Sequence, residues 1–240
     1  NSLAHAEELV QLTEEARRIL MVGNVFVYHP GIQELKKRIK SGELGDLYEI
    51  ACTRKGHGPI RSDVNVMWDL APHDLAILLY LTERMPKQVH AIGFNYLNGR
   101  TLEDSVDLTL RFDQGMSARV NLSWLHPLKE RKVTVVGSKK MAVFDDVNGS
   151  RPLTIYERSA VPFGDRTPTD FGEFKMQTTD GEITMPKIDA TEPMKLELEH
   201  FLNCVVKRET PITDAKNGRD IVKILEFAQQ SMKESKWMTI

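Results

Sequence analysis

The chain has 240 residues, a length that fits one large domain or two small ones. Hydrophobic residues make up 41% and charged residues 28%, which is typical of a folded globular protein and excludes a disordered chain. The 32 basic and 34 acidic side chains leave a formal net charge of -2. Because no overall field would attract polyanions, we expect neither a nucleic-acid partner nor a membrane partner.

The two cysteines, Cys52 and Cys204, lie far apart in the sequence, so they indicate neither a disulfide framework nor a zinc site. No apolar run approaches the roughly 20 residues that cross a bilayer, and the N-terminal residues lack the pattern of a signal peptide. We therefore expect a soluble protein in a reducing compartment, the cytoplasm.

The first third of the chain predicts a helix, a strand and a second helix. Residues 2–19 have apolar side chains at helical spacing, namely Leu9, Leu12, Ala16 and Ile19. Residues 19–28 form a nearly continuous β-rich run, which predicts a strand covered on both faces in a parallel sheet. Pro30 then opens a helix, and Gly42 is expected to end it.

The rest of the chain predicts a large, mainly antiparallel sheet with helices. After a strand at 47–54 and a glycine-bearing loop, residues 68–81 read as an apolar helix. Strands follow at 88–96, 105–112, 116–124, 132–136 and 141–144, with one apolar and one polar face on the second and third. Residues 148–191 predict a loop-rich excursion with weak strands at 153–156 and 182–185. Helices at 192–207 and 214–236 close the chain, and Asp214 is the expected N-cap of the second.

Asp69 and His73 are the candidate catalytic pair. Four residues apart, they share one helix face, and a carboxylate beside an imidazole raises its basicity. Such a pair suits general acid/base chemistry. Spacing alone leaves two other interpretations open, a helix N-cap with a surface ion pair and a metal site.

Two further groups are candidate substrate contacts. Trp124, His126 and Lys129 follow a predicted strand, where basic side chains could pair with phosphate or carboxylate oxygens of a sugar. Arg61, Asn65 and Trp68 precede the Asp69/His73 pair. A solvated loop and a core tryptophan remain the alternatives for these residues.

Several familiar motifs are absent from the sequence. No G-x-S-x-G, no G-x-x-x-x-G-K-[ST], no G-x-G-x-x-G and no H-E-x-x-H occurs. We therefore expect no metal site and no dinucleotide loop within this chain.

An ordered series of segments resembles the Gfo/Idh/MocA oxidoreductases. The series is GNVFVYHPGIQELKKRIKSGELGDLYEI, then DVNVMWDLAPHDLAILLYL, then SWLHPLKERKVTVVGSKKMAVFDD, then EPMKLELEHFLNCV. The resemblance implies an NAD(P)-dependent sugar or nucleotide-sugar dehydrogenase. It further implies that His73 exchanges the hydroxyl proton, that Asp69 orients or charges His73, and that Asn24 and Tyr28 contact the cofactor.

The family's glycine-rich loop and its Glu-Lys-Pro motif do not occur in this chain. We therefore expect an α/β (α+β) chain in which residues 1–28 are a remnant of a Rossmann-type domain. Residues 29–240 are then a substrate-binding and oligomerisation domain, with an open sheet that has helices on one face. The family habit of pairing such sheets predicts a homodimer or tetramer. The alternative is a non-catalytic sugar-binding or dimerisation module.

Overall fold

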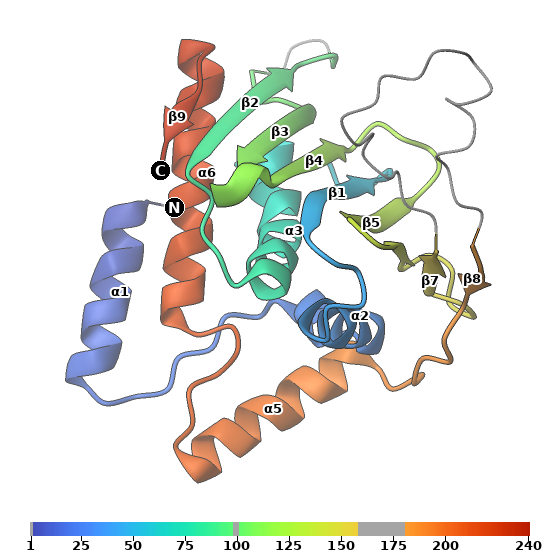
Figure 1. Ribbon diagram of the computed structural model, residues 1–240. Coiled ribbons are helices and arrows are strands. Elements are labelled where there is room, and N and C mark those ends of the chain that lie inside the picture. Colours follow the sequence, from blue (N-terminus) through green and yellow to red (C-terminus); the bar gives the residue numbers. More distant parts are fainter. Residues whose placement is uncertain (1, 98–100, 158–180) are drawn as a thin grey trace.

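The computed structural model describes residues 2–97, 101–157 and 181–240. Its centre is a nine-stranded sheet in the order β8-β7-β6-β5-β1-β4-β3-β2-β9 (Figure 1). The strands are β1 (Leu47–Lys55), β2 (Gln88–Phe94), β3 (Ser105–Arg111), β4 (Ser117–Ser123), β5 (Glu130–Gly137), β6 (Met141–Asp145), β7 (Leu153–Tyr156), β8 (Ile183–Thr184) and β9 (Met238–Thr239).

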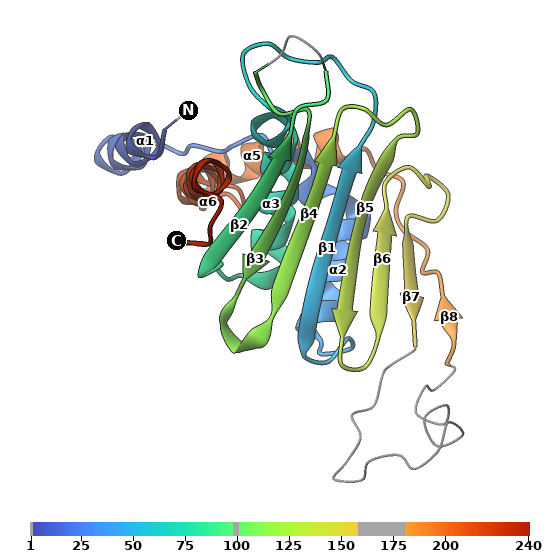
Figure 2. The ribbon, with the colours of Figure 1, turned by 90° about the horizontal axis from the view of Figure 1, so that it is seen from above.

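One pair of strands in this sheet is parallel. β1 runs parallel to β4 at the centre, and every other neighbouring pair is antiparallel. The predicted hairpins are present as β3–β4 and β5–β6. Figure 2 shows the helices gathered on one face of the sheet and no described element across the other. The predicted open, mainly antiparallel sheet with helices on one face is therefore confirmed.

Five α-helices and two short 3-10 helices accompany the sheet in the described part of the chain. They are α1 (Leu3–Glu15), η1 (Val25–Tyr28), α2 (Pro30–Lys40), α3 (Val66–Thr82), η2 (Asp113–Gly115), α5 (Pro193–Lys207) and α6 (Ala215–Glu234). α3 packs on the sheet, and α6 packs on α3, α1 and β2. The Asp214 carboxylate caps α6 by accepting from the Asn217 N–H at 2.8 Å, as predicted.

Strand alternation places the core between the sheet and its helices. Val106, Leu108 and Leu110 on β3 are buried, whereas Asp107 and Arg111 between and after them are exposed. Because successive side chains on a strand point to opposite faces, the polar set lies on the uncovered face. The same period on β1 buries Ile50, Cys52 and Arg54 on the helix side.

The predicted strand at residues 19–28 is wrong. Met21 makes a single antiparallel bridge with Asp214, and residues 25–28 form the 3-10 helix η1. A strand requires a ladder of backbone hydrogen bonds with a neighbour, and the described residues supply only that one bridge. The apolar run is nevertheless partly buried, since Val27 and Tyr28 belong to the core.

The predicted buried stripe of the first helix is also wrong. Leu9 and Leu12 are 52% and 51% exposed, whereas Val10 is buried. α1 packs on α6 only along the side that carries Leu3, Ala6, Val10 and Thr13. The contact with α6 thus buries the face of α1 that carries Val10, and not the face that the spacing of apolar residues indicates.

α5 carries an apolar stripe that faces solvent. Met194, Leu198, Leu202 and Val206 recur every fourth residue, and the exposed fraction rises along them from 47% to 81%.

The predicted strands near 153–156 and 182–185 exist as β7 and β8, and the rest of that loop-rich excursion, residues 158–180, lies outside the described residues. Among the described helices, none is long and apolar enough to cross a membrane.

Candidate active site around His73

A pocket of about 300 Å³ lies at the carboxyl ends of β1 and β4, beside the first turns of α3. Its walls come from η1, β1 and the loop after it, α3, and the strand ends near β4 and β5. The lining residues are Phe26, Arg54, Lys55, Gly56, His57, Gly58, Pro59, Asp69, Leu70, His73, Trp124, Lys129 and Arg131. Carboxyl ends of parallel strands are the usual place for ligands in α/β sheets.

The start of α3 positions both members of the predicted catalytic pair. Asn65 caps the helix by accepting from the Trp68 N–H at 3.1 Å. Asp69 follows within the first turn and His73 one turn later, so both side chains reach the pocket from the same helix face.

The Asp69 carboxylate is held by two donors from outside its helix. Trp124 Nε1 donates to Oδ2 at 3.1 Å, and Arg61 Nη1 donates to Oδ1 at 3.2 Å. No hydrogen bond joins Asp69 to His73 in the described structure. Burial and the charge of Arg54 lower the His73 pKa, and the negative charge of Asp69 acts in the opposite direction without a hydrogen bond.

His73 is largely buried, and its Nδ1 atom has no hydrogen-bond partner among the described residues. Burial lowers the pKa of its imidazole below the usual value, and the positive charges of Arg54 and Arg131 lower it further. Phe26 contacts the ring edge-on, with 5.4 Å between centroids. These surroundings favour the neutral imidazole near pH 7, which is the form that accepts a proton.

A buried ion pair between Arg54 and Asp74 lies next to His73. Arg54 donates from Nε and Nη2 to the two oxygens of Asp74 at 2.8 and 3.0 Å. The two side chains are only 7% and 2% exposed, so each charge depends on the other for compensation. The Phe26 ring lies 4.4 Å from the Arg54 guanidinium and 5.1 Å from that of Arg131.

The structure divides the predicted substrate contacts between two places. Trp124 and Lys129 line the His73 pocket, and Arg61 reaches it through its bond to Asp69. Asn65 and Trp68 instead donate to Gln229 Oε1, at 3.0 and 3.2 Å, in a neighbouring cleft of about 690 Å³. His126 is partly exposed and is not among the residues that line the His73 pocket.

The two predicted cofactor contacts lie in the interior. Asn24 is buried, and its Nδ2 atom has no hydrogen-bond partner in the described part of the chain. The Tyr28 hydroxyl lies 3.0 Å from Thr213 Oγ1. Burial is the main cause that raises the Tyr28 pKa. Neither residue lines the pocket around His73.

The N-terminus of α2, which follows η1 next to the His73 pocket, does not fit the phosphates of a dinucleotide. Such a cofactor needs glycine backbone close to its phosphates at an open helix N-terminus. At the start of α2, His29 Nδ1 already accepts the Gly31 N–H at 3.0 Å. A Cβ on Gly31 would lie 2.7 Å from the Phe144 ring, so this glycine accommodates an aromatic side chain instead. The same described residues hold no group of three His, Cys, Asp or Glu side chains suited to a metal ion.

Two residues that contact or flank His73, Phe26 and Arg54, lie outside the candidate groups that the sequence indicated. One of them left a signal. Arg54 continues the buried alternation of Ile50 and Cys52, and a charge in a buried register requires a partner. Phe26 left none, because it reaches His73 only through the tertiary fold.

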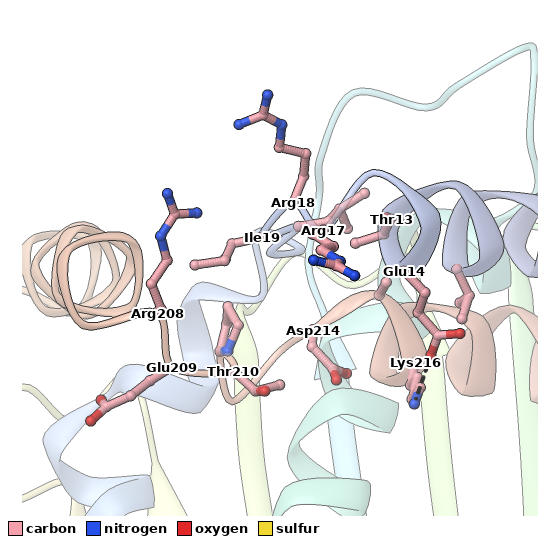
Figure 3. Close-up of a pocket in the computed structure, with 14 residues that line it drawn as sticks. Thr13, Glu14, Arg17, Arg18, Ile19, Arg208, Glu209, Thr210, Asp214 and Lys216 are labelled. Carbon is pink, nitrogen blue, oxygen red and sulfur yellow. Dashed lines mark ion pairs between the residues drawn. The ribbon is translucent and has the colours of Figure 1, made fainter.

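A separate pocket of about 270 Å³ lies between the end of α1 and the loop that joins α5 to α6 (Figure 3). It carries charges of both signs, and Lys216 pairs with Glu14 at 2.9 Å within it. None of the predicted site residues lines this pocket. We therefore place the candidate chemistry at His73.

Comparison with known proteins finds a family model and a curated relative that this chain resembles. The family model described as "GFO/IDH/MocA C-terminal domain" matches residues 32–143. A curated relative, the UDP-N-acetylglucosamine 3-dehydrogenase of Acidithiobacillus ferrooxidans, is 25% identical over 217 residues, which are 90% of this chain and 63% of the relative. The chain thus spans less than two thirds of that relative's length.

Solved structures of oxidoreductases share the fold. The structure of the same Acidithiobacillus enzyme superimposes with a TM-score of 0.78 at 21% identity, over 97% of this chain and 68% of that one. The aldose-aldose oxidoreductase from Caulobacter crescentus, complexed with glycerol, gives 0.80 at 16% identity, over 100% and 69%. The WlbA dehydrogenase from Bordetella pertussis, in complex with NADH and UDP-GlcNAcA, gives 0.73 at 18% identity, over 99% and 68%.

These findings show an α/β domain with the fold of the oxidoreductase structures named above. Residues 32–143 match the GFO/IDH/MocA C-terminal domain model, in agreement with the resemblance of the sequence motifs.

Proposed function

We propose that this chain is the substrate-binding part of a sugar or nucleotide-sugar oxidoreductase, which transfers hydride between a carbinol carbon and NAD or NADP. The observation that carries the proposal is His73, a half-buried imidazole with a lowered pKa at the wall of a pocket. An alcohol that loses hydride from carbon also loses its hydroxyl proton, and a neutral imidazole accepts that proton. The dehydrogenase names of the relatives support the same reaction class.

In this proposal His73 takes the hydroxyl proton during oxidation and returns it during reduction. Asp69 stabilises the imidazolium by its negative charge, and Trp124 and Arg61 fix the position of that carboxylate. Because the capped N-terminus of α2 offers no cradle for a dinucleotide, we assign none of the described residues to the cofactor and leave NAD and NADP both open. Asn24 and Tyr28 then serve to pack the interior.

We also propose the domain division that the sequence indicated, with residues 1–28 ending a dinucleotide-binding domain and residues 29–240 forming the substrate domain. Two observations support it. Residues 19–24 form one isolated β-bridge, at Met21, and no strand ladder with the described residues, and the apolar stripe of α5 faces solvent. Both are features of surfaces that another domain covers. A homodimer or tetramer in the cytoplasm completes the proposal, consistent with two buried, unpaired cysteines.

Turnover by a fusion tests the catalytic role. The dinucleotide-binding portion of the Acidithiobacillus relative is placed ahead of this chain, and reduced cofactor is measured with NAD or NADP and a panel of UDP-sugars. We expect His73→Ala to lower kcat/KM at least about tenfold, roughly 1.4 kcal/mol. His5→Ala, on the exposed side of α1, is the matched control and should leave turnover unchanged. A smaller loss for His73→Ala than tenfold would contradict the role of His73.

A second candidate function is a non-catalytic sugar-binding or dimerisation module. The observation that favours it is the capped and filled N-terminus of α2, which leaves no described phosphate cradle. Calorimetry of the chain with NAD and NADP tests whether these residues bind a dinucleotide, which the non-catalytic module would not do. Micromolar binding of either dinucleotide by these residues alone would exclude the non-catalytic module.

A further inference from the structure

Three arginines line the pocket between the end of α1 and the loop that joins α5 to α6, and this pocket shares no lining residue with the one around His73 (Figure 3). Arg17 and Arg18 follow the C-cap of α1, and Arg208 is the C-cap of α5. All three residues are exposed, and none of their guanidinium groups has a hydrogen bond or an ion pair with another described residue. Their N–H donors are therefore available to a ligand.

The acidic side chains that line the same pocket do not pair with these arginines. Glu14 forms an ion pair with Lys216 at 2.9 Å, and the Asp214 carboxylate caps α6. Figure 3 shows the carboxylate of the third, Glu209, pointing to the opposite side from the Arg208 guanidinium. A local excess of positive charge therefore remains at the arginines, although the formal net charge of the whole chain is -2.

The backbone of two of these arginines is strained. Arg17 and Arg208 have φ values of 49° and 60°, and they are two of the five non-glycine residues with positive φ in the described part of the chain. Helices commonly end with a residue in this left-handed conformation, and that residue is usually glycine because a Cβ is unfavourable there. Side chains held in such conformations cluster at ligand-binding sites. The strain thus indicates a role for the two guanidinium groups.

The arginines bring together two segments that are distant in the sequence. Residues 13–20 and 208–216 supply the whole lining of the pocket apart from Val10. Its volume of about 270 Å³ lies just below the usual range of small-ligand pockets, roughly 300 to 1,000 Å³. Arginine binds phosphate oxygens through parallel N–H donors. A small ligand with a phosphate group fits both the size of the pocket and its charge.

We propose that Arg17, Arg18 and Arg208 form a binding site for a phosphomonoester, a small molecule with one phosphate group. A phosphomonoester carries about -1.5 to -2 charges at pH 7 and three acceptor oxygens, so it matches three guanidinium groups better than a carboxylate does. The site goes beyond the proposed function, because it takes part in neither hydride nor proton transfer. The bound ligand bridges the end of α1 and the start of α6, and it therefore stabilises the packing of these helices.

Calorimetry of the whole chain at constant ionic strength tests the site, with glucose 6-phosphate as the probe. We expect a Kd below about 1 mM. Arg17→Gly and Arg208→Gly should each weaken binding at least about tenfold, because each removes charge-assisted hydrogen bonds. Glycine suits the positive φ at both positions, so neither variant should unfold at a lower denaturant concentration than the unliganded wild type. Arg18→Gln, at a residue without positive φ, is an independent variant that should also bind more weakly.

Two matched controls separate the site from general effects of backbone and charge. Ser235→Gly makes the same backbone change at the C-cap of α6, where φ is 51°. Arg84→Gln removes an exposed arginine elsewhere on the surface. Both variants should bind glucose 6-phosphate as the wild type does.

Three results would overturn the proposal. The first is no binding of glucose 6-phosphate at millimolar concentration. The second is equally tight binding of glucuronate, in which a carboxylate is the anionic group, because the site would then not select phosphate. The third is a loss of affinity in Arg84→Gln as large as that in Arg17→Gly, which would indicate unspecific attraction by surface charge. The His73 pocket and its proposed function would stand in each case.

Discussion

Arg54 and Arg131 lie directly opposite each other on the neighbouring strands β1 and β5, and the ring of Phe26 contacts both guanidinium groups. Like charges in a cross-strand pair are normally destabilising. Here each arginine has its own carboxylate, Asp74 for Arg54 and Asp146 for Arg131. The two arginines therefore place two positive charges beside His73, and these charges lower the pKa of its imidazole.

Loss of the Asp74 charge should destabilise the fold strongly. Asp74→Leu leaves the buried Arg54 guanidinium without its partner, which costs about 3 to 5 kcal/mol. The double variant Arg54→Met/Asp74→Leu removes both charges and should be more stable than Asp74→Leu alone. Denaturant unfolding measures all three proteins. A double variant at least as unstable as the single one would show that the pair does more than compensate its own charges.

The His73 imidazole should titrate below its usual pKa of about 6.5. Burial is the first cause, and the charges of Arg54 and Arg131 add to it. NMR titration of the ring resonances should therefore place the midpoint under pH 6.5, and Arg131→Gln should move it upward. Arg84→Gln, an exposed arginine elsewhere on the surface, serves as control and should leave it in place. A midpoint above 6.5 would contradict the electrostatic description of the pocket.

Stability should fall as the pH drops below about 6.5. Burial lowers the pKa of His29, His73 and His200 in the folded state, so the unfolded chain binds more protons between those pKa values and 6.5. The free energy of unfolding therefore rises with pH through that window. It falls when the pH drops through the same window toward the folded-state pKa values. Glu197 acts in the opposite direction, because burial raises the pKa of its carboxyl. Comparison of denaturation curves for wild type and His73→Gln isolates one histidine, and the variant should depend less on pH.

The uncovered face of the sheet should mediate self-association. Ile92 on β2 is 48% exposed there, on a face with the mixed polarity of a two-fold interface. Sedimentation velocity should show a dimer at micromolar concentration, and Ile92→Glu should shift it toward the single chain. Leu12→Glu places the same charge at a 51% exposed leucine of α1 and should leave the dimer intact. A wild-type protein that stays at one-chain mass to high micromolar concentration would exclude this interface.

The sequence by itself determined the periodic elements of this chain. Three local signals were sufficient to place elements from the sequence. They are the alternation of polar and apolar residues on β3 and β4, the proline and glycine at the two ends of α2, and the Asp214 cap of α6. The spacing of Asp69 and His73 likewise put both on one face of α3. Local signals of this kind depend on backbone geometry within a few residues, which a sequence shows directly.

Only the tertiary structure decided which residues meet. Residues 19–28 have strand-like composition, but a strand exists only where a neighbour supplies a ladder, and here one bridge and a 3-10 helix result. Asp69 binds Trp124 and Arg61 instead of His73, and Arg54 reaches Asp74 across 20 residues of chain. Two buried charges compensate each other only when they lie close together in space. Strand register and helix packing decide which segments come that close.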